Sequence, residues 1–180
     1  MLRIDHRESR DIDIFLNDPQ QLAFLDPTKR DFDFEIPPSG HTGDGARFLK
    51  LAFASIGEID FIVAGSLTSP ASTAETINGQ SLALETVLEI IAKKIHHRGS
   101  AIAPRDIFDI AAAGERHADS IIRGLREHGA AVGATLAALD GLNPEFVDRA
   151  ISQLAIKPGF EAIARTARNR AREIMQSVVS

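Results

Sequence analysis

The sequence contains no cysteine, which excludes both disulfide bonds and thiolate metal sites. A bound metal ion would therefore have oxygen or imidazole ligands, and oxygen ligands favour hard cations such as Mg²⁺ or Mn²⁺. Tryptophan and tyrosine are also absent, so most of the residues that stack on bases in single-strand-binding proteins are missing. The lack of cysteine fits a reducing compartment, and we expect a cytoplasmic protein.

An excess of positive charge and long apolar runs are lacking as well. Against 25 Asp and Glu there are 20 Lys and Arg, so the net charge is −5 and gives no argument for nucleic-acid binding. The arginines of ARTARNRAR (164–172) spread around a helix, which favours a solvated surface. No apolar run approaches the roughly 18–20 residues of a membrane span, and MLRIDHRESR is too charged for a secretory signal, so we expect no membrane partner.

The 180-residue chain changes in composition near residue 80. Before this point, runs typical of strands alternate with turn signals: DIDIFL, DFDFEI, ARFLKLAFA and EIDFIVAG. We expect residues 46–54 and 58–64 to pair as antiparallel strands. GHTGDG (40–45) is expected to be a loop, and residues 66–81 a polar connector.

After residue 80, apolar residues recur at helical spacing. Gly99 is expected to end a helix whose apolar stripe consists of Leu84, Val87, Leu88, Ile91 and Ile95. A further helix is expected to begin at Pro104 and to stop near Gly114. The predicted fold class is therefore α+β, with a small mixed β-sheet core at residues 1–80 followed by a helical C-terminal bundle at residues 81–180.

Two carboxylates lie two positions apart in the strand-like run HRESRDIDIF. Because side chains alternate along a strand, Asp11 and Asp13 should share one face, about 6.6 Å apart along the chain. The opposite, buried face is expected to hold Ile12, Ile14 and Leu16. Two carboxylates on one rigid face can hold divalent cations for a displacement at phosphate.

A third carboxylate, Asp60, opposes the apolar residues of EIDFIVAG. If this strand lies beside the first, Asp60 would complete a three-carboxylate cluster. The alternative is that all three acids form the solvated face of an amphipathic sheet. The run DFDFEI has the same alternation without any further sign of a site, so spacing alone favours the alternative.

Other residue types in the chain fit a phosphate ligand. Arg7 and Ser9 precede the acids at the same alternate spacing, and a guanidinium and a hydroxyl can both donate to a triphosphate. Lys94 flanks the apolar stripe of its helix, where it is either a phosphate ligand or a surface lysine whose stem covers apolar residues. Asp106 and Asp109 share a helix face, although an acid in the first turn also stabilises the helix itself.

Three segments together resemble a known family. HRESRDIDIF, LEIIAKKIHHRG and APRDIFDIAAA are similar to the successive motifs of the AbiEii/AbiGii toxin family of nucleotidyltransferases, to which the MenT toxins are related. These motifs run His-Arg-x-Ser-x-Asp-hydrophobic-Asp, Lys-Lys-hydrophobic-x-x-Arg and Arg-Asp-hydrophobic-x-Asp-hydrophobic. The resemblance covers about residues 4 to 113, and the order of the three motifs makes it more specific than any one of them.

The resemblance implies a DNA polymerase β-like nucleotidyltransferase fold. The implied activity is metal-dependent transfer of a nucleotidyl group from a nucleoside triphosphate to an RNA acceptor such as tRNA, or to a protein. The implied biological role is that of the toxin in a toxin–antitoxin or phage-defence pair, with a cognate antitoxin protein as a partner.

The resemblance also implies roles for individual residues. The implied catalytic residues match the acids and the lysine of the motifs: Asp11, Asp13, Asp60, Lys94, Asp106 and Asp109. Asp11 and Asp13, with Asp60 as a looser match, would hold Mg²⁺ or Mn²⁺. The nucleoside triphosphate would be contacted by Arg7, Ser9 and Lys94.

One family motif has no counterpart in this sequence. A Gly-Gly or Gly-Ser pair should precede the Arg-x-Ser segment, where backbone amides at a helix start would cradle the triphosphate. Here only MLRID precedes the motif, and neither GDG (43–45) nor AGS (64–66) replaces the missing pair. Either the true start lies upstream of Met1, or the chain is a shortened, inactive relative. The alternative function is therefore a non-catalytic protein-interaction module.

Overall fold

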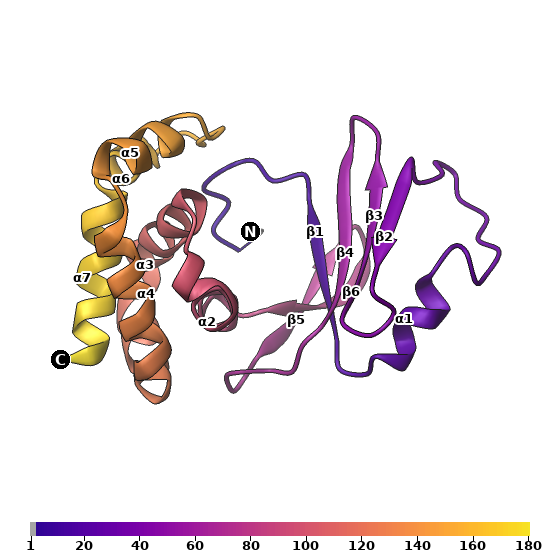
Figure 1. Ribbon diagram of the computed structural model, residues 1–180, viewed down its shortest axis with the longest axis horizontal. Coiled ribbons are helices and arrows are strands. Elements are labelled where there is room, and N and C mark those ends of the chain that lie inside the picture. The colour runs from indigo at the N-terminus through magenta and orange to yellow at the C-terminus, as the bar shows by residue number, and fades with distance from the viewer. Residues whose placement is uncertain (1–2) are drawn as a thin grey trace. The chain divides into compact units, whose positions relative to one another are not determined.

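The computed structural model describes residues 3–180 (Figure 1). Within these residues it contains a four-stranded mixed sheet, a two-stranded sheet and seven α-helices, which confirms the predicted α+β class with a helical C-terminal part. The chain forms two compact units. The sheet unit is Ser9–Gly65, and the helical unit is Ser66–Ser180 together with the N-terminal segment that ends at Glu8. Chain contacts thus divide the molecule at other positions than the change in composition near residue 80.

The sheet unit has the strand order β1-β4-β3-β2. The parallel pair is β1 (Ile12–Leu16) and β4 (Gly57–Val63). The antiparallel neighbours are β3 (Phe48–Phe53) and β2 (Gly40–Gly43), so the predicted antiparallel pairing of residues 46–54 with 58–64 is confirmed. A single short helix, α1 (Gln20–Leu25), follows β1.

One face of this sheet is apolar and packs on α1. Leu49 and Leu51 of β3 are buried together with Leu22 of α1. The expectation that Ile12 and Ile14 are buried is wrong, because they are 56% and 38% exposed. The reason is that α1 packs on β3, whereas β1 lies at the edge of the sheet.

Two predictions for residues 31–45 are wrong. DFDFEI is no strand: it has no strand partner within residues 3–180, and its side chains are exposed except for the half-buried Phe34. GHTGDG is not a loop throughout, because its first four residues form β2. This edge strand is closed by Asp44, whose Oδ1 accepts hydrogen bonds from the amides of Ala46 and Arg47 and makes a tight turn into β3.

The helical unit contains the remaining elements. Its hairpin is β5 (Ser72–Ile77) and β6 (Gln80–Glu85). Its helices are α2 (Val87–Arg98), α3 (Pro104–Gly124), α4 (Gly129–Gly141), α5 (Pro144–Ser152), α6 (Glu161–Arg165) and α7 (Ala167–Val179). α7 packs against both α3 and α4 (Figure 1), and the buried residues of this core include Phe108, Ile121 and Met175. Among residues 3–180, no helix combines the length and apolar character needed to cross a membrane.

The polar connector expected at residues 66–81 contains most of the hairpin instead. Asn78 and Gly79 have φ values of 51° and 79°, which is the geometry of a tight two-residue hairpin turn. Leu84 therefore lies in β6 and not in a helix. The helix begins at Val87, where the Thr86 hydroxyl accepts a hydrogen bond from the amide of Glu89.

Gly114 does not end a helix as predicted, because α3 continues to Gly124. A Cβ atom at Gly114 would lie 2.2 Å from Cδ1 of Ile174 in α7. The glycine thus allows two helices to approach closely. From the sequence alone, a glycine that ends a helix cannot be distinguished from a glycine that allows two helices to pack closely.

Candidate functional site

A row of polar residues crosses all four strands of the sheet unit. Asp13 of β1 lies opposite Asp60 of β4, Asp60 opposite Lys50 of β3, and Lys50 opposite Thr42 of β2. Residues aligned across neighbouring strands face the same side, so this polar row lies opposite the apolar face. The expectation that the strand of Asp60 lies beside that of Asp13 is confirmed.

Asp60 has one oxygen in an ion pair and one that is unused. Its Oδ2 lies 3.3 Å from Nζ of Lys50. Its Oδ1 is buried and has no hydrogen-bond partner within residues 3–180. Burial raises the pKa of Asp60, the charge of Lys50 lowers it, and the neighbouring Asp13 raises it further, with a raised pKa as the net result. The polar row thus holds a partly desolvated carboxylate beside a second acid.

Sequence reasoning missed Lys50. Its ammonium also contacts Glu58, and this hydrogen bond is the largest cause of the raised pKa of Lys50. The signal was present in RFLKLAF, where Lys50 alternates with Leu49 and Leu51 and therefore had to lie on the polar face. Lys50 neutralises part of the acidic charge of Glu58 and Asp60.

The polar row fits a hard divalent cation only in part. Within residues 3–180, no group of three or more Asp, Glu or His side chains is arranged to hold a metal ion, and Asp11 lies just before β1 and is exposed. However, Mg²⁺ is commonly held by one or two carboxylates together with waters and substrate phosphates. Asp13 and Asp60 supply such a pair, and the unpartnered Oδ1 of Asp60 is an oxygen that a cation would satisfy.

A second group of charged residues surrounds Asp109 in the helical unit. The Asp109 side chain is fully buried in α3. Its Oδ1 accepts hydrogen bonds from Nε2 of His6 at 2.7 Å and from Nε of Arg7 at 2.8 Å. Its Oδ2 accepts one from a terminal nitrogen of Arg7 at 3.1 Å and lies 2.9 Å from Nζ of Lys94. One buried carboxylate thus connects three basic side chains.

The protonation of Asp109 follows from these contacts. Burial alone raises the pKa of this carboxyl, but the hydrogen bonds from His6 and Arg7 and the charge of Lys94 outweigh it and hold the pKa well below its usual range. Asp109 is therefore ionised, and its negative charge fixes the basic groups around it.

Lys94 contacts a second acid besides Asp109. Its Nζ donates to Oδ1 of Asp106 at 2.7 Å, and both acids therefore face α2 from the same side of α3. Oδ2 of Asp106 also accepts a hydrogen bond from the amide of Ala103 at 3.3 Å, so this acid caps α3 as well. Arg98 lies 3.8 Å from the same carboxylate. We term His6, Arg7, Lys94, Asp106 and Asp109 the charge cluster.

The predicted site residues thus fall into two groups. The sheet unit holds Ser9, which is exposed, and the three acids Asp11, Asp13 and Asp60. The helical unit holds Arg7, Lys94, Asp106 and Asp109. Arg7 and Ser9 alternate in the sequence, but they do not belong to one strand, because β1 begins only at Ile12 and Arg7 forms an isolated bridge with Ile156.

A family model described as nucleotidyl transferase AbiEii toxin, type IV TA system, matches residues 1–176. The chain belongs to the AbiEii family. The predicted resemblance is therefore confirmed, and it covers more of the chain than the three motifs do. No curated protein and no solved structure gives a significant match. Family membership indicates a nucleotidyltransferase toxin of a type IV toxin–antitoxin system.

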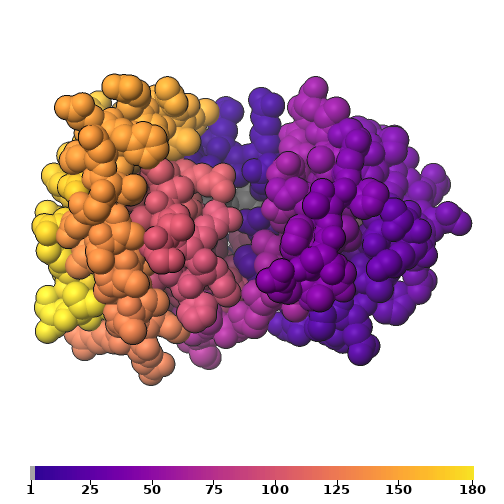
Figure 2. Space-filling view, in the orientation of Figure 1, coloured from indigo at the N-terminus to yellow at the C-terminus, as the bar shows by residue number. Residues whose placement is uncertain are grey.

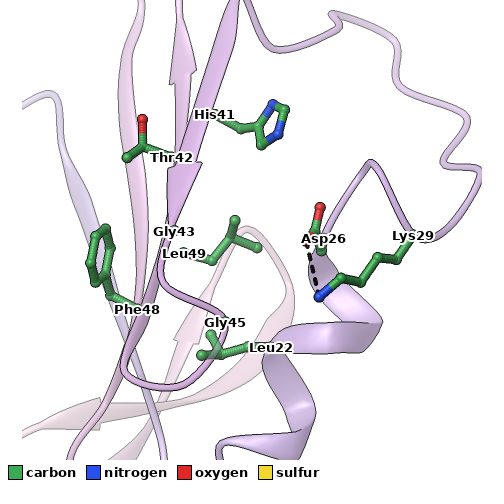
Figure 3. Close-up of a pocket in the computed structure, with 9 residues that line it drawn as sticks. All are labelled: Leu22, Asp26, Lys29, His41, Thr42, Gly43, Gly45, Phe48 and Leu49. Carbon is green, nitrogen blue, oxygen red and sulfur yellow. Dashed lines mark ion pairs between the residues drawn. The ribbon is translucent and has the colours of Figure 1, made fainter.

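The AbiEii chain also has a hollow of about 350 Å³ in its sheet unit. Figure 3 shows Leu22 and Leu49 directed toward each other, with His41 and the ion pair of Asp26 and Lys29 beside them. His41 and Leu49 belong to the apolar face, opposite the polar row. Asp13 and Asp60 do not line the hollow, whereas Thr42, the member of the polar row in β2, does.

The arginines of the last helix are partly neutralised in this AbiEii chain. Arg170 pairs with Glu115, and Arg172 lies 2.9 Å from Asp140. The C-terminal helices, orange to yellow in Figure 2, form a closely packed surface in which these pairs are half exposed. The segment ARTARNRAR does not form one solvated helix, because α6 ends at Arg165 and α7 begins at Ala167, which is buried together with Ala171.

Proposed function

We propose that this protein is a metal-dependent nucleotidyltransferase that moves a nucleotidyl group from a nucleoside triphosphate to an RNA or protein acceptor. Asp13 and Asp60, assisted by Asp11, would hold Mg²⁺ or Mn²⁺. The bound cation would neutralise the phosphate charge. The observation that carries this proposal is the buried, unpartnered Oδ1 of Asp60 beside the aligned Asp13.

The proposed reaction assigns a proton to Asp60. The acceptor hydroxyl attacks the α-phosphorus, a new P–O bond forms, the bond to pyrophosphate breaks, and the hydroxyl proton passes to the Asp60 carboxylate. A base is more effective when its pKa lies nearer the working pH. Burial shifts the pKa of Asp60 in this direction, whereas the charge of Lys50 lowers it and a bound cation would lower it further.

The charge cluster supports binding of polyphosphate. Lys94 and Arg7 keep small exposed fractions, 17% and 13% of their side chains, and the buried acids fix their positions. Fixed cations neutralise developing phosphate charge without having to reorganise. We assign to Lys94 and Arg7 the triphosphate contacts that the family motifs imply. Ser9, at the start of the sheet unit, is the proposed hydroxyl donor to the phosphates.

The acceptor and the partners follow from family membership and the residue chemistry. An RNA acceptor such as tRNA is proposed from the MenT relationship. A cognate antitoxin protein is proposed as the partner, in keeping with the type IV toxin–antitoxin family. We further propose a cytoplasmic location, where nucleoside triphosphates and RNA are present.

The proposal is tested by incubating the protein with pooled RNA, Mg²⁺ and one nucleoside triphosphate at a time, followed by mass spectrometry of RNA and protein. The expected result is a mass increase of one or more nucleotidyl groups that disappears with EDTA. Asp33→Asn is the matched control for Asp13→Asn, because Asp33 is an exposed acid of the same unit outside the polar row. Absence of any transfer with all four triphosphates would contradict the proposal.

A non-catalytic interaction module is the second candidate. The exposure of Ile12 and Ile14 on edge strand β1 favours it, because exposed apolar residues at a sheet edge can pair with another chain. Growth inhibition on expression separates the two candidates. Asp11→Ala combined with Asp13→Ala should abolish the inhibition if the protein is an enzyme, whereas unchanged inhibition would support the interaction module.

A further inference from the structure

His6 is, like Asp109, a fully enclosed member of the charge cluster. Its side chain is fully buried, and its ring packs edge-on against Phe108 and Phe160, with centroid distances of 4.9 and 5.9 Å. Its Nε2 forms a 2.7 Å hydrogen bond with Asp109, and its Nδ1 has no hydrogen-bond partner within residues 3–180. The fold therefore confines one imidazole nitrogen to one carboxylate oxygen.

The direction of this hydrogen bond follows from the acceptor. An ionised carboxylate can only accept, so Nε2 of His6 carries the hydrogen and donates it to Asp109. The remaining contacts of Asp109 come from Arg7 and Lys94, the two cations that the proposed function places at the phosphates. The His6 side chain is fully buried, and its hydrogen bond to Asp109 links it to both cations.

We propose that His6 is a positioning residue that sets the orientation of the Asp109 carboxylate and, through it, the positions of the Lys94 ammonium and the Arg7 guanidinium. A carboxylate group rotates easily about its terminal torsion. The His6 donor is fixed between Phe108 and Phe160 and therefore restricts this rotation in Asp109. The backbone supports the lock, because the carbonyl of His6 accepts a hydrogen bond from the amide of Lys157 at 3.0 Å. The consequence for catalysis rests on the proposed function, whereas the consequence for Lys94 does not.

Three variants of the full chain separate positioning from packing. His6→Leu fills the space between the two rings but donates nothing. His6→Gln carries an amide that reaches about as far as Nε2 and can donate to Asp109. Phe160→Leu disturbs the same packing and leaves the hydrogen bond in place, so it is the matched control.

The main readout is the reactivity of the Lys94 amine toward a small acylating reagent, measured site by site by mass spectrometry. In the wild type, Lys94 is held by two carboxylates and should react slowly. We expect His6→Leu to accelerate this reaction about fivefold or more, a change that corresponds to the loss of a charge-assisted hydrogen bond. His6→Gln and Phe160→Leu should stay within about twofold of the wild type.

Transfer kinetics give the second readout. Because misplacement of a fixed group lowers the rate of the chemical step, kcat should fall about tenfold in His6→Leu and recover in His6→Gln, with little change in KM. Failure of the wild type to transfer nucleotide would overturn the proposed function, and the Lys94 reactivities would still decide the role of His6. Equal Lys94 reactivity in His6→Leu and wild type, or an equal acceleration in Phe160→Leu, would overturn the positioning role.

His6→Leu is a substitution in a core position, and its folding is checked by its thermal transition. If this variant does not fold, His6→Asn replaces it, because the shorter asparagine amide cannot reach Asp109 while it remains polar. The same comparison with His6→Gln then applies. A Lys94 amine that reacts alike in the asparagine and glutamine variants would overturn the proposal.

Discussion

Buried acids have different numbers of hydrogen-bond donors in the two units of the molecule. In the helical unit, Asp106, Asp109 and Glu89 are all buried and each accepts several donors; Glu89, for example, accepts from the amides of Leu67 and Thr68 at 3.0 and 2.8 Å. In the sheet unit, Asp60 keeps a buried oxygen without a partner among the described residues. A buried acid that is fully paired supports the fold, and one that is left incomplete is available for a ligand.

The same difference appears in the cores. The helical unit surrounds its charge cluster with a continuous apolar core that includes Ile91, Ile107 and Ile110. The sheet unit has only three fully buried apolar side chains among its described residues, Leu22, Leu49 and Leu51. In the helical unit the buried charges therefore stabilise the core. In the sheet unit, Asp60 keeps an oxygen that is available for a ligand.

The largest expected effect is on activity and concerns the sheet unit. Asp13→Asn should lower nucleotidyl transfer by more than about a hundredfold, because even groups that only orient a metal ligand cost 10–100-fold when they are removed. Stability should change little, since Asp13 is exposed. Initial transfer rates and thermal unfolding of the same preparation measure both quantities. A folded Asp13→Asn variant with wild-type turnover would contradict a role of the polar row in nucleotidyl transfer.

The next effect is on stability and concerns the helical unit. Asp109→Asn should lower the free energy of unfolding by about 3–5 kcal/mol, because it removes the buried counter-charge that Asp109 supplies to Arg7 and leaves Lys94 with Asp106 alone. Urea unfolding measures this change. The matched control is Asp140→Asn, which removes a half-exposed pair with Arg172 and should cost less than about 1 kcal/mol. Equal losses in the two variants would mean that the charge cluster does not stabilise the unit.

A smaller effect is expected where β1 meets β4. Gly57 has a φ of 152°, and a Cβ atom there would lie 2.2 Å from the carbonyl oxygen of Arg10, immediately before the carboxylates. Gly57→Ala should therefore destabilise the sheet unit by about 1–3 kcal/mol, because backbone must shift. Gly65→Ala, with no atom within 4 Å of the added Cβ, is the control. Urea midpoints that are equal for the two variants would contradict the close approach.

The smallest effect concerns pH. The raised pKa of Asp60 means that the folded protein binds this proton more tightly than the unfolded chain does, so its contribution to stability is largest at low pH and is lost as the pH rises through the pKa of the folded state. Asp60→Asn should then raise the melting temperature by about 2 °C at pH 7 in EDTA. The difference from wild type should shrink as the pH falls. A lower melting temperature of the variant at pH 7 would contradict the cost of burying Asp60.

The sequence predicted features that depend on local periodicity. Alternation placed Asp13 and Asp60 on polar strand faces, and helical spacing placed Asp106 and Asp109 on one side of α3. The hairpin β5–β6 was missed although Asn78 and Gly79 are a strong turn signal, because β5 is polar and Leu84 of β6 also fits the helical spacing of the apolar stripe that follows it.

Pairings between distant segments were beyond the reach of the sequence pattern. The contact of His6 and Arg7 with Asp109 joins residues more than 100 positions apart, and nothing local distinguishes these basic residues from a solvated strand. Similarly, the exposure of Ile12 depends on where α1 packs, which the alternation of β1 does not specify. The acids of the polar row were predictable, while the partners of the charge cluster required the fold.

The most direct test of the central claim is NMR of the protein during titration with Mn²⁺, whose unpaired electrons broaden nearby resonances. We predict that the amide signals of Asp13 and Asp60 broaden first, and that this broadening is lost in Asp13→Asn but not in Asp33→Asn. First broadening at Asp106 and Asp109, or a uniform weak effect along the chain, would contradict a cation site on the polar row.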